Sequence, residues 1–226
     1  MNTISEVPPK EQQRAVPHRI GVWRSASTTA SVAYVIATVC GVALAFFAVE
    51  PIQACFVAAW WIFVMVVIRS DLADFLIPDH ASLGIALLGL AAIGTRSLWI
   101  PEPSPWPSLP WSHGAIAVLA AMVQGATAAA VLWVVGRTFR AIRGFDGLGF
   151  GDVKLAGASA IWLDPWQQAL ALHLATLTAI GVVLLTRNEG LRAGDGALPF
   201  GAFLAPAAWI TYLAVTMGPQ WFEVAP

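Results

Sequence analysis

The chain has 226 residues, of which 58% are hydrophobic and only 11% are charged, and its mean hydropathy is +0.72. A soluble domain carries about a quarter of charged residues, so this composition excludes a water-soluble globular protein. The net charge of -1 gives no reason to expect binding to nucleic acid. The apolar stretches have the length of helices rather than of the alternating strands of a membrane barrel. We therefore expect an all-α, polytopic membrane helical bundle.

The N-terminal segment 1–28 is polar and basic, with Lys10, Arg14, Arg19 and Arg24. A basic start before an apolar run is also typical of a signal peptide. However, this basic region is long, the apolar run over about 29–49 approaches the length of a membrane span, and further apolar runs follow. We therefore predict a cytoplasmic tail at 1–28, a membrane-embedded domain at 29–217 and a short C-terminal tail at 218–226.

The later apolar runs are interpreted as further membrane-spanning helices, which gives about seven transmembrane helices in total. They cover about 54–68, 81–99, 114–135, 155–163 and 166–186, and the last one ends near Met217. The run over 155–163 is short for a span unless its helix begins near Asp152. The histidine inside the sixth run, His173, is interpreted as a hydrogen-bonded helix contact, since no second histidine stands at metal-ligand spacing.

Basic residues predict the orientation of the bundle. Besides the N-terminal tail they occur at Arg69, in the segment 137–143, and at Arg187 and Arg192, whereas the loops after the first, third and fifth spans contain none. Loops rich in Lys and Arg face the cytoplasm, so we predict a cytoplasmic N-terminus and an external C-terminus. This orientation places the segments 70–80 and 147–155 at the same, cytoplasmic, face.

Those two segments hold the candidate chemistry. Segment 70–80 contains Asp71, Asp74 and Asp79, and segment 147–155 is a glycine-dense turn that ends in Asp152 and Lys154. An ionisable group at the boundary with hydrocarbon is costly, so it marks a functional site by default. When two carboxyls share a site, like-charge repulsion keeps one of them protonated. The protonated acid can polarise a peptide carbonyl while the ionised one takes a proton from an attacking water.

The motifs in these segments resemble those of a known family. Gly149-Phe150-Gly151-Asp152 is similar to the GxGD signature of intramembrane aspartic proteases. The longer stretch 147–155 resembles the second aspartate block of type IV prepilin peptidases, and 71–79 resembles their first, an aspartate seven residues before a proline. Leu198-Pro199-Phe200-Gly201 is similar to their C-terminal Pro-Phe-Gly motif. Three blocks in the family order make the resemblance more specific than a lone GxGD.

The resemblance implies an aspartic endopeptidase with Asp71 and Asp152 as the catalytic pair, and with Asp74 as the alternative first acid. Supporting site residues would be Gly149, Gly151, Lys154, Asp74 and Pro78. The family removes the leader peptide of prepilin-like precursors at the cytoplasmic face of the inner membrane. We therefore expect prepilin-like protein substrates, contact with membrane lipid, and neither a cofactor nor a metal ion.

The sequence also departs from part of the family. Many bacterial members carry paired cysteines in a cytoplasmic insert and also methylate the new N-terminus. Here Cys40 and Cys55 lie in apolar surroundings without metal-ligand spacing, and are interpreted as small buried hydrophobes. The loop between the first two spans is short. These features disfavour N-methylation and favour the compact form of the family, of the kind that serves Flp/Tad-type pili or archaeal-type preflagellins.

Other interpretations remain open at this point. A small proton-coupled transporter would use the same aspartates as a relay, although transporter sites lie near the middle of the bilayer between matching halves. A scaffold would need neither aspartate. Lys154 is expected either to reach lipid phosphate or to steer the charge of the aspartates. Asp79 is interpreted as a cap for the third span, and Pro199 as the start of the last helix or as a kink in it.

Overall fold

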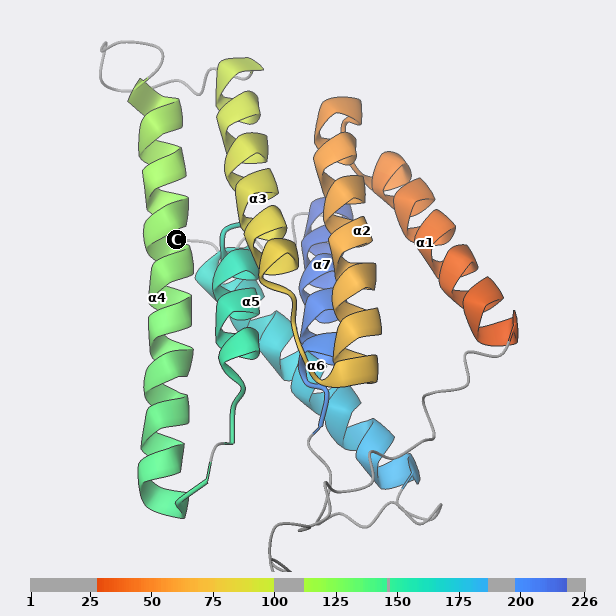
Figure 1. Cartoon of the computed structure of the whole chain (residues 1–226). Helices are drawn as coiled ribbons and strands as arrows, with labels where there is room; N and C mark the ends of the chain where they lie inside the picture. The colour runs from red at the N-terminus through yellow and green to blue at the C-terminus, as the bar shows by residue number, and fades with distance from the viewer. Residues whose placement is uncertain (1–27, 100–111, 146, 187–197, 219–226) are drawn as a thin grey trace, which may run out of the picture.

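The computed structural model describes residues 28–99, 112–145, 147–186 and 198–218. The predicted tails, apart from Thr28 and Gly218, lie outside these residues. Within them all regular structure is α-helical, in agreement with the predicted class (Figure 1). The helices are α1 (Thr28–Ala48), α2 (Pro51–Asp74), α3 (Asp79–Trp99), α4 (Ser112–Arg143), α5 (Phe150–Ala160), α6 (Pro165–Thr186) and α7 (Gly201–Met217).

Four of the helices are long and apolar enough to cross a membrane: α1, α2, α4 and α6. The chain is therefore a multi-pass membrane protein. The apolar helix α7 is shorter, with 17 residues. Helix α5 has only 11 residues and is about 16 Å long at 1.5 Å per residue, so the helix alone is shorter than the hydrocarbon core of a bilayer. It begins at Phe150, just ahead of Asp152, as the length of the fifth apolar run suggested.

Two helices continue beyond their predicted ends. Helix α2 reaches Asp74, where the predicted span ended at Ile68, because neither glycine nor proline interrupts it and Ser70 bonds back to the helical carbonyl of Val66. It stops at Phe75, which adopts a left-handed conformation with φ of 55°. Asp71 and Asp74 are therefore helical residues rather than loop residues. Helix α4 likewise passes Val135 and ends at Arg143, before Gly144 with φ of 79°.

Six of the seven described helices form two groups that differ in burial, whereas α3 has features of both, with Ile85 buried and Leu83 and Leu87 exposed. Helices α2, α5 and α7 lie at the centre of the bundle in Figure 1, and we call them the inner group. They supply most of the large side chains that are fully buried: Val57, Trp60, Val64, Val67, Leu155, Ser159, Leu204, Trp209 and Thr211. Helices α1, α4 and α6, the outer group, lie around them with many large apolar side chains exposed. Such surfaces fit contact with lipid tails.

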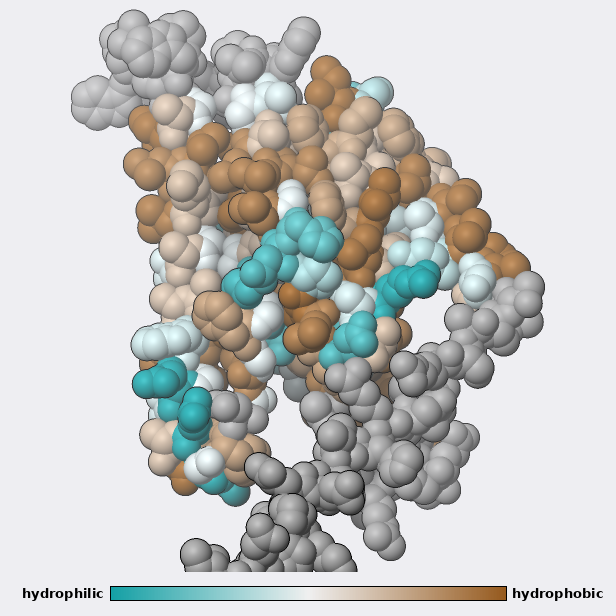
Figure 2. Space-filling model, viewed as in Figure 1, coloured by the Kyte–Doolittle hydropathy of each residue, from teal (hydrophilic) through white to brown (hydrophobic). Residues whose placement is uncertain are grey.

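Polar and apolar side chains are also separated along the bundle. Figure 2 shows hydrophobic side chains over most of the upper half of one face. Hydrophilic side chains gather in its lower half, around the start of α3 and the end of α4. The end of α4 carries Arg137, Arg140 and Arg143, which belong to the basic residues that predict the cytoplasmic side.

Candidate active site

Asp71 lies in the last turn of α2 and is 4% exposed. Its position follows from the continuation of α2, because the extra helical turns carry the side chain back into the bundle. The carboxylate Oδ2 accepts a hydrogen bond from the backbone N–H of Ala202 at 2.7 Å. A buried carboxylate needs such donors, since burial without them costs several kcal/mol, about 2–7 for a polar group.

The donor to Asp71 belongs to the start of α7. Helix α7 begins at Gly201, so the Ala202 N–H is one of the amides that has no partner within the helix. The Gly201 N–H also bonds to the Asp71 carboxyl. The positive end of the helix dipole thus points at this carboxylate. Of the two interpretations of Pro199, the structure supports a helix start, although Pro206 lies inside α7.

Asp152 lies in the first turn of α5 and faces the same end of the bundle as Asp71. Its carboxylate folds back toward Gly149, whose backbone N–H donates to it. A Cβ atom on Gly149 would lie 3.1 Å from Asp152 Oδ2. Gly149 has an ordinary extended backbone, with φ of -68° and ψ of 142°. Glycine therefore leaves space beside the carboxylate here, and no unusual backbone angle calls for it.

Burial and the neighbouring carboxylate both act on Asp152. Burial raises the pKa of Asp152, and the negative charge of Asp71 raises it further, to about 6, against the opposing hydrogen bond from Gly149. Two carboxyls of which one raises the pKa of the other in this way can share one proton. With a pKa of about 6 for Asp152, the pair is able to hold one proton between two carboxyls near pH 6.

Ile77 lies between the two aspartate-bearing segments, and the sequence interpretation did not identify it. It belongs to the short connection from α2 to α3. A Cβ atom on Gly151 would lie 3.1 Å from Ile77 Cβ, and one on Gly201 would lie 2.5 Å from Ile77 Cδ1 and 3.1 Å from Asp71 Oδ2. Both glycines therefore let the starts of α5 and α7 close around one isoleucine. No motif spacing could have revealed this contact.

Lys154 forms an ion pair with Asp79, which begins α3. Its ammonium also lies 5.0 Å from the ring centre of Phe150. Neither predicted role of Lys154 included this partner. Helix α3 begins at Asp79, two residues before the predicted span, because the Pro78 carbonyl accepts the N–H groups of Ala81 and Ser82; Asp79 is thus the first helical residue rather than the predicted cap. The ion pair ties the start of α3 to the turn that carries Asp152.

The two candidates for the first acid have different surroundings. Asp74 is exposed at the end of α2, whereas Asp71 is buried beside the start of α7. The geometry therefore favours Asp71 as the partner of Asp152.

In the ranges that the structure describes, no cluster of His, Cys, Asp or Glu has the makeup of a metal site. His173 bonds to the Ala169 carbonyl within α6, in line with the interpretation of a helix contact. The prediction of buried cysteines is wrong, since Cys40 and Cys55 are both exposed on the bundle.

Comparison with known proteins identifies the relatives of this arrangement. Residues 55–186, which include both aspartates, match the model of the type IV leader peptidase family. The chain belongs to this family. No solved structure matches the chain. The match ends before α7. The start of α7, which donates a hydrogen bond to Asp71 in this leader peptidase family member, therefore lies outside the matched region.

Individual relatives carry the name prepilin leader peptidase/N-methyltransferase. The protein from Burkholderia pseudomallei (strain 1026b) is 35% identical over 127 residues, which cover 53% of this chain and 41% of the relative. The one from Aeromonas hydrophila is 31% identical, over 60% and 49%. The one from Dickeya chrysanthemi is 32% identical, over 68% and 60%. The chain thus spans about half the length of the curated relatives that it matches.

Proposed function

We propose that this chain is a membrane-embedded aspartic endopeptidase that cleaves the leader peptide of prepilin-like precursors. The observation that carries the proposal is the placement of two acids, 81 positions apart in the sequence, at one end of the bundle: Asp71, buried on α2, and Asp152, at the start of α5. The family membership and the names of the relatives support the choice of substrate.

The surroundings of the two carboxyls suggest their roles. Asp71 receives backbone donors from the start of α7, and such donors favour the charged form of a carboxylate. The raised pKa of Asp152 favours its protonated form. We therefore assign the negative charge of the pair to Asp71, which acts as general base, and the proton to Asp152, which acts as general acid.

The reaction then follows in two balanced steps. Asp71 takes a proton from water while the water oxygen forms a bond to the scissile carbonyl carbon. Asp152 hydrogen-bonds to the carbonyl oxygen and stabilises the charge that develops there. In the second step the C–N bond breaks, the amine nitrogen takes a proton from the pair, and the carbonyl is restored as a carboxylic acid. The pair returns to its single-proton state.

The location of the site follows from the charge pattern. Arg69 and the basic end of α4 lie at the same end of the bundle as the aspartates, which supports a cytoplasmic site in the inner membrane. A basic leader would meet the aspartates there, and the apolar segment behind it would pass between lipid-facing helices. Lipid therefore surrounds both enzyme and substrate in this proposal. Peptide-bond cleavage is the only activity proposed.

The test is co-expression with a prepilin-like substrate, read as a size shift on a gel. Asp71→Asn and Asp152→Asn are each expected to abolish cleavage while the protein still accumulates in the membrane. Asp74→Asn is the matched control, since it removes the same charge one helical turn away, and it is expected to process the substrate. Complete processing by either of the first two variants would contradict the proposal.

The transporter interpretation makes a different forecast. Both carboxyls lie at one end of the bundle rather than midway along it, which argues against a relay through the membrane. Reconstituted wild-type protein that moves protons or solute across liposomes but leaves every tested prepilin intact would support transport instead.

A further inference from the structure

A second polar site lies at the opposite end of the bundle from the aspartates. A pocket of about 1110 Å³ opens between the start of α2, the end of α3, the turn between α5 and α6, and the end of α7. Asp71 of α2, Asp152 of α5 and Ala202 of α7 lie at the other ends of their helices. Along α2, 18 residues separate Gln53 from Asp71, a distance of about 27 Å at 1.5 Å per residue. The predicted orientation places this pocket at the outer face of the membrane.

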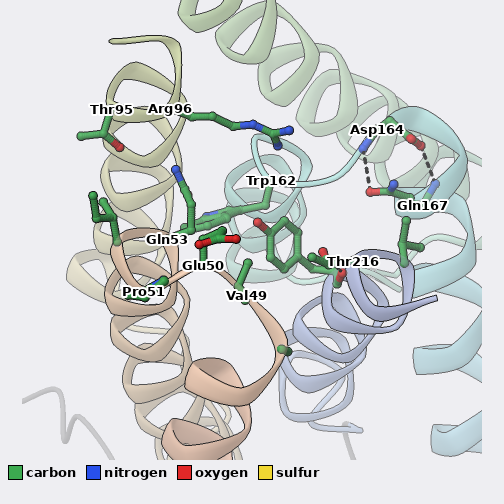
Figure 3. A pocket seen from close by; sticks show the side chains of 14 residues that line it. Val49, Glu50, Pro51, Gln53, Thr95, Arg96, Trp162, Asp164, Gln167 and Thr216 are labelled. Carbon is green, nitrogen blue, oxygen red and sulfur yellow. Dashed lines mark hydrogen bonds between the residues drawn. The ribbon is translucent and has the colours of Figure 1, made fainter. Parts of the chain in front are cut away.

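The pocket holds charges of both signs. Arg96 comes from the end of α3, Glu50 stands directly before α2, and Asp164 precedes α6 (Figure 3). In Figure 3 the Arg96 side chain reaches across the pocket, and Glu50 and Trp162 both line it. Asp164 caps α6, because its carboxylate accepts the Gln167 N–H at 2.9 Å. The Glu50 carboxylate makes no capping bond to α2.

Glu50 and Arg96 are both exposed to the pocket. Within the described part of the chain, neither the Glu50 carboxylate nor the Arg96 guanidinium forms an ion pair or a hydrogen bond with a side chain. A carboxylate and a guanidinium that face one cavity without pairing are available to a ligand that carries the two opposite charges. A ligand with only negative charge would meet Glu50 and Asp164 at close range.

One wall of the pocket is aromatic and held in place. The rings of Trp162 and Tyr212 meet edge to face at 5.6 Å, and Trp60 stacks on Trp162 at 4.5 Å. The indole N–H of Trp162 donates to the Ile85 carbonyl at 2.9 Å, which fixes the ring. Aromatic faces attract cations, most strongly when their geometry is set before binding. Because the Glu50 carboxylate lines the same pocket as this wall, the two together offer a place for an ammonium group.

The rim of the pocket is apolar where it meets α1 and α2. Ala48, Val49 and Ile52 line it there, and Val215 of α7 also lines the pocket. Ile52 is exposed, and the large apolar residues Phe46 and Phe47 of the adjacent α1 are exposed as well. An acyl chain that leaves the pocket on this side would lie against hydrocarbon side chains rather than enter water.

We propose that this pocket binds an amine–phosphate zwitterion, the headgroup of an ethanolamine phospholipid. Arg96 binds the phosphate, Glu50 accepts hydrogen bonds from the primary ammonium against the wall of Trp162 and Tyr212, and the acyl chains leave over the apolar rim. The mixed charges favour this headgroup over an anionic glycerol lipid, which has no ammonium for Glu50. They also favour it over choline, whose methylated nitrogen has no N–H to donate.

Native mass spectrometry of the full chain in detergent tests the proposal. Phosphatidylethanolamine, phosphatidylglycerol and phosphatidylcholine are added in separate titrations, and soluble glycerophosphoethanolamine forms a further arm. Wild-type protein is expected to retain phosphatidylethanolamine about tenfold more tightly than phosphatidylglycerol, the ratio of one charge-assisted hydrogen bond. Binding of the soluble headgroup as tightly as the lipid would show that the ligand is a free metabolite and overturn the lipid assignment.

Two variants separate the proposed contacts. Glu50→Gln is expected to lower the affinity for phosphatidylethanolamine about tenfold and leave phosphatidylglycerol unchanged, whereas Arg96→Gln lowers the affinity for both lipids. Arg69→Gln, which removes a cation at the other end of α2, is the matched control and should alter neither. Thermal unfolding of each variant checks that it is folded. Equal binding of all lipids by wild type, or an unchanged preference in Glu50→Gln, would overturn the proposal.

Discussion

The inner helices and the outer helices contain similar apolar residues, but they differ in how much of this apolar surface is buried. In the best spanning window of α2, 39% of the residues are buried, against 11% in α1 and in α4. Leu155 on α5 is 1% exposed, while Leu185 on α6 is 81% exposed. Hydropathy alone does not distinguish these leucines. The inner group buries most of its large apolar side chains in the core, while the outer group contributes mainly small residues such as Ala45, Ala171 and Ala175 and leaves many large apolar side chains exposed to lipid.

This difference explains where the site can exist. Both aspartates lie on inner helices, and so does the start of α7 that donates to Asp71. Close packing fixes their relative positions, which acid–base chemistry requires to within a fraction of an ångström. A helix whose side chains face fluid lipid could not hold a carboxylate so firmly. Substitutions should therefore be costly in the inner group and mild in the outer group.

The largest effect is expected from Leu155→Ala. Its side chain is buried in the core, so truncation leaves a cavity and should lower the free energy of unfolding by about 2–5 kcal/mol. Leu185→Ala in the outer group should change it by less than about 0.5 kcal/mol. Unfolding in mixed micelles measures both values. Similar losses at the two positions would remove the distinction between the groups.

Gly201→Val should rank next. The added Cβ would lie 2.5 Å from Ile77 Cδ1, 3.0 Å from Ile77 Cγ1 and 3.1 Å from Asp71 Oδ2, so Ile77 or the start of α7 must shift, and either shift disturbs the packing beside the carboxylate. We expect the rate of leader cleavage to fall about a hundredfold, the usual result of a displacement near 1 Å. Gly181→Val on α6 is the control, because nothing lies within 4 Å of its added Cβ, and its rate should stay within a factor of two or so. A fully active Gly201→Val would show that the contact is not needed.

The dependence of cleavage on pH tests the assignment of the proton to Asp152. Burial and the charge of Asp71 raise its pKa to about 6. If the protonated form of Asp152 is the active one, the rate is highest where Asp152 is protonated and Asp71 is still ionised, and it falls about tenfold for each pH unit above the pKa of Asp152. Rates of purified protein between pH 5 and 8 measure this limb, and Asp74→Asn should leave it in place. A rate that rises with pH over the same range would reverse the roles of the two acids.

The smallest effect is expected at the Lys154–Asp79 ion pair. Lys154 is 34% exposed and Asp79 is 80% exposed, so solvent screens the pair and it should stabilise the fold by about 0.2–1 kcal/mol. Lys154→Gln and Asp79→Asn should each slow cleavage only a few-fold. The exchanged pair, Lys154→Asp with Asp79→Lys, should recover part of that loss. No recovery, with a large loss in Lys154→Gln alone, would give the ammonium a role beyond pairing.

The sequence predicted the class, the number of helices and the short fifth helix because these depend on local hydropathy and on glycine. It also predicted that Asp71 and Asp152 share one end of the bundle, since basic residues set the orientation. It did not predict the extra turns of α2, because polar residues at the end of a buried helix resemble a loop. The hydrogen bond from the Ala202 amide to Asp71 could not be predicted from the sequence either, since 131 positions separate the two residues.

The contacts of Ile77 also could not be predicted from the sequence. The sequence interpretation gave Gly149 and Gly151 supporting roles by resemblance, without the reason for either. The structure supplies the reasons: one glycine leaves space for the carboxylate of Asp152, and the other for Ile77. These are contacts between chain segments, and no periodicity encodes them.

The long end of α4 has a consequence for how deeply Asp152 is immersed. Helix α4 runs eight residues past Val135, about 12 Å, before the chain reverses at Gly144. The chain after this turn runs back along α4 and brings Leu148 to Gly136. A Cβ atom on Gly136 would lie 3.5 Å from Leu148 Cβ. This contact fixes the depth of Asp152 along the bundle axis close to the point where the apolar part of α4 ends. Lengthening the hairpin beyond Arg143 would extend it into water and leave the acid at the same height.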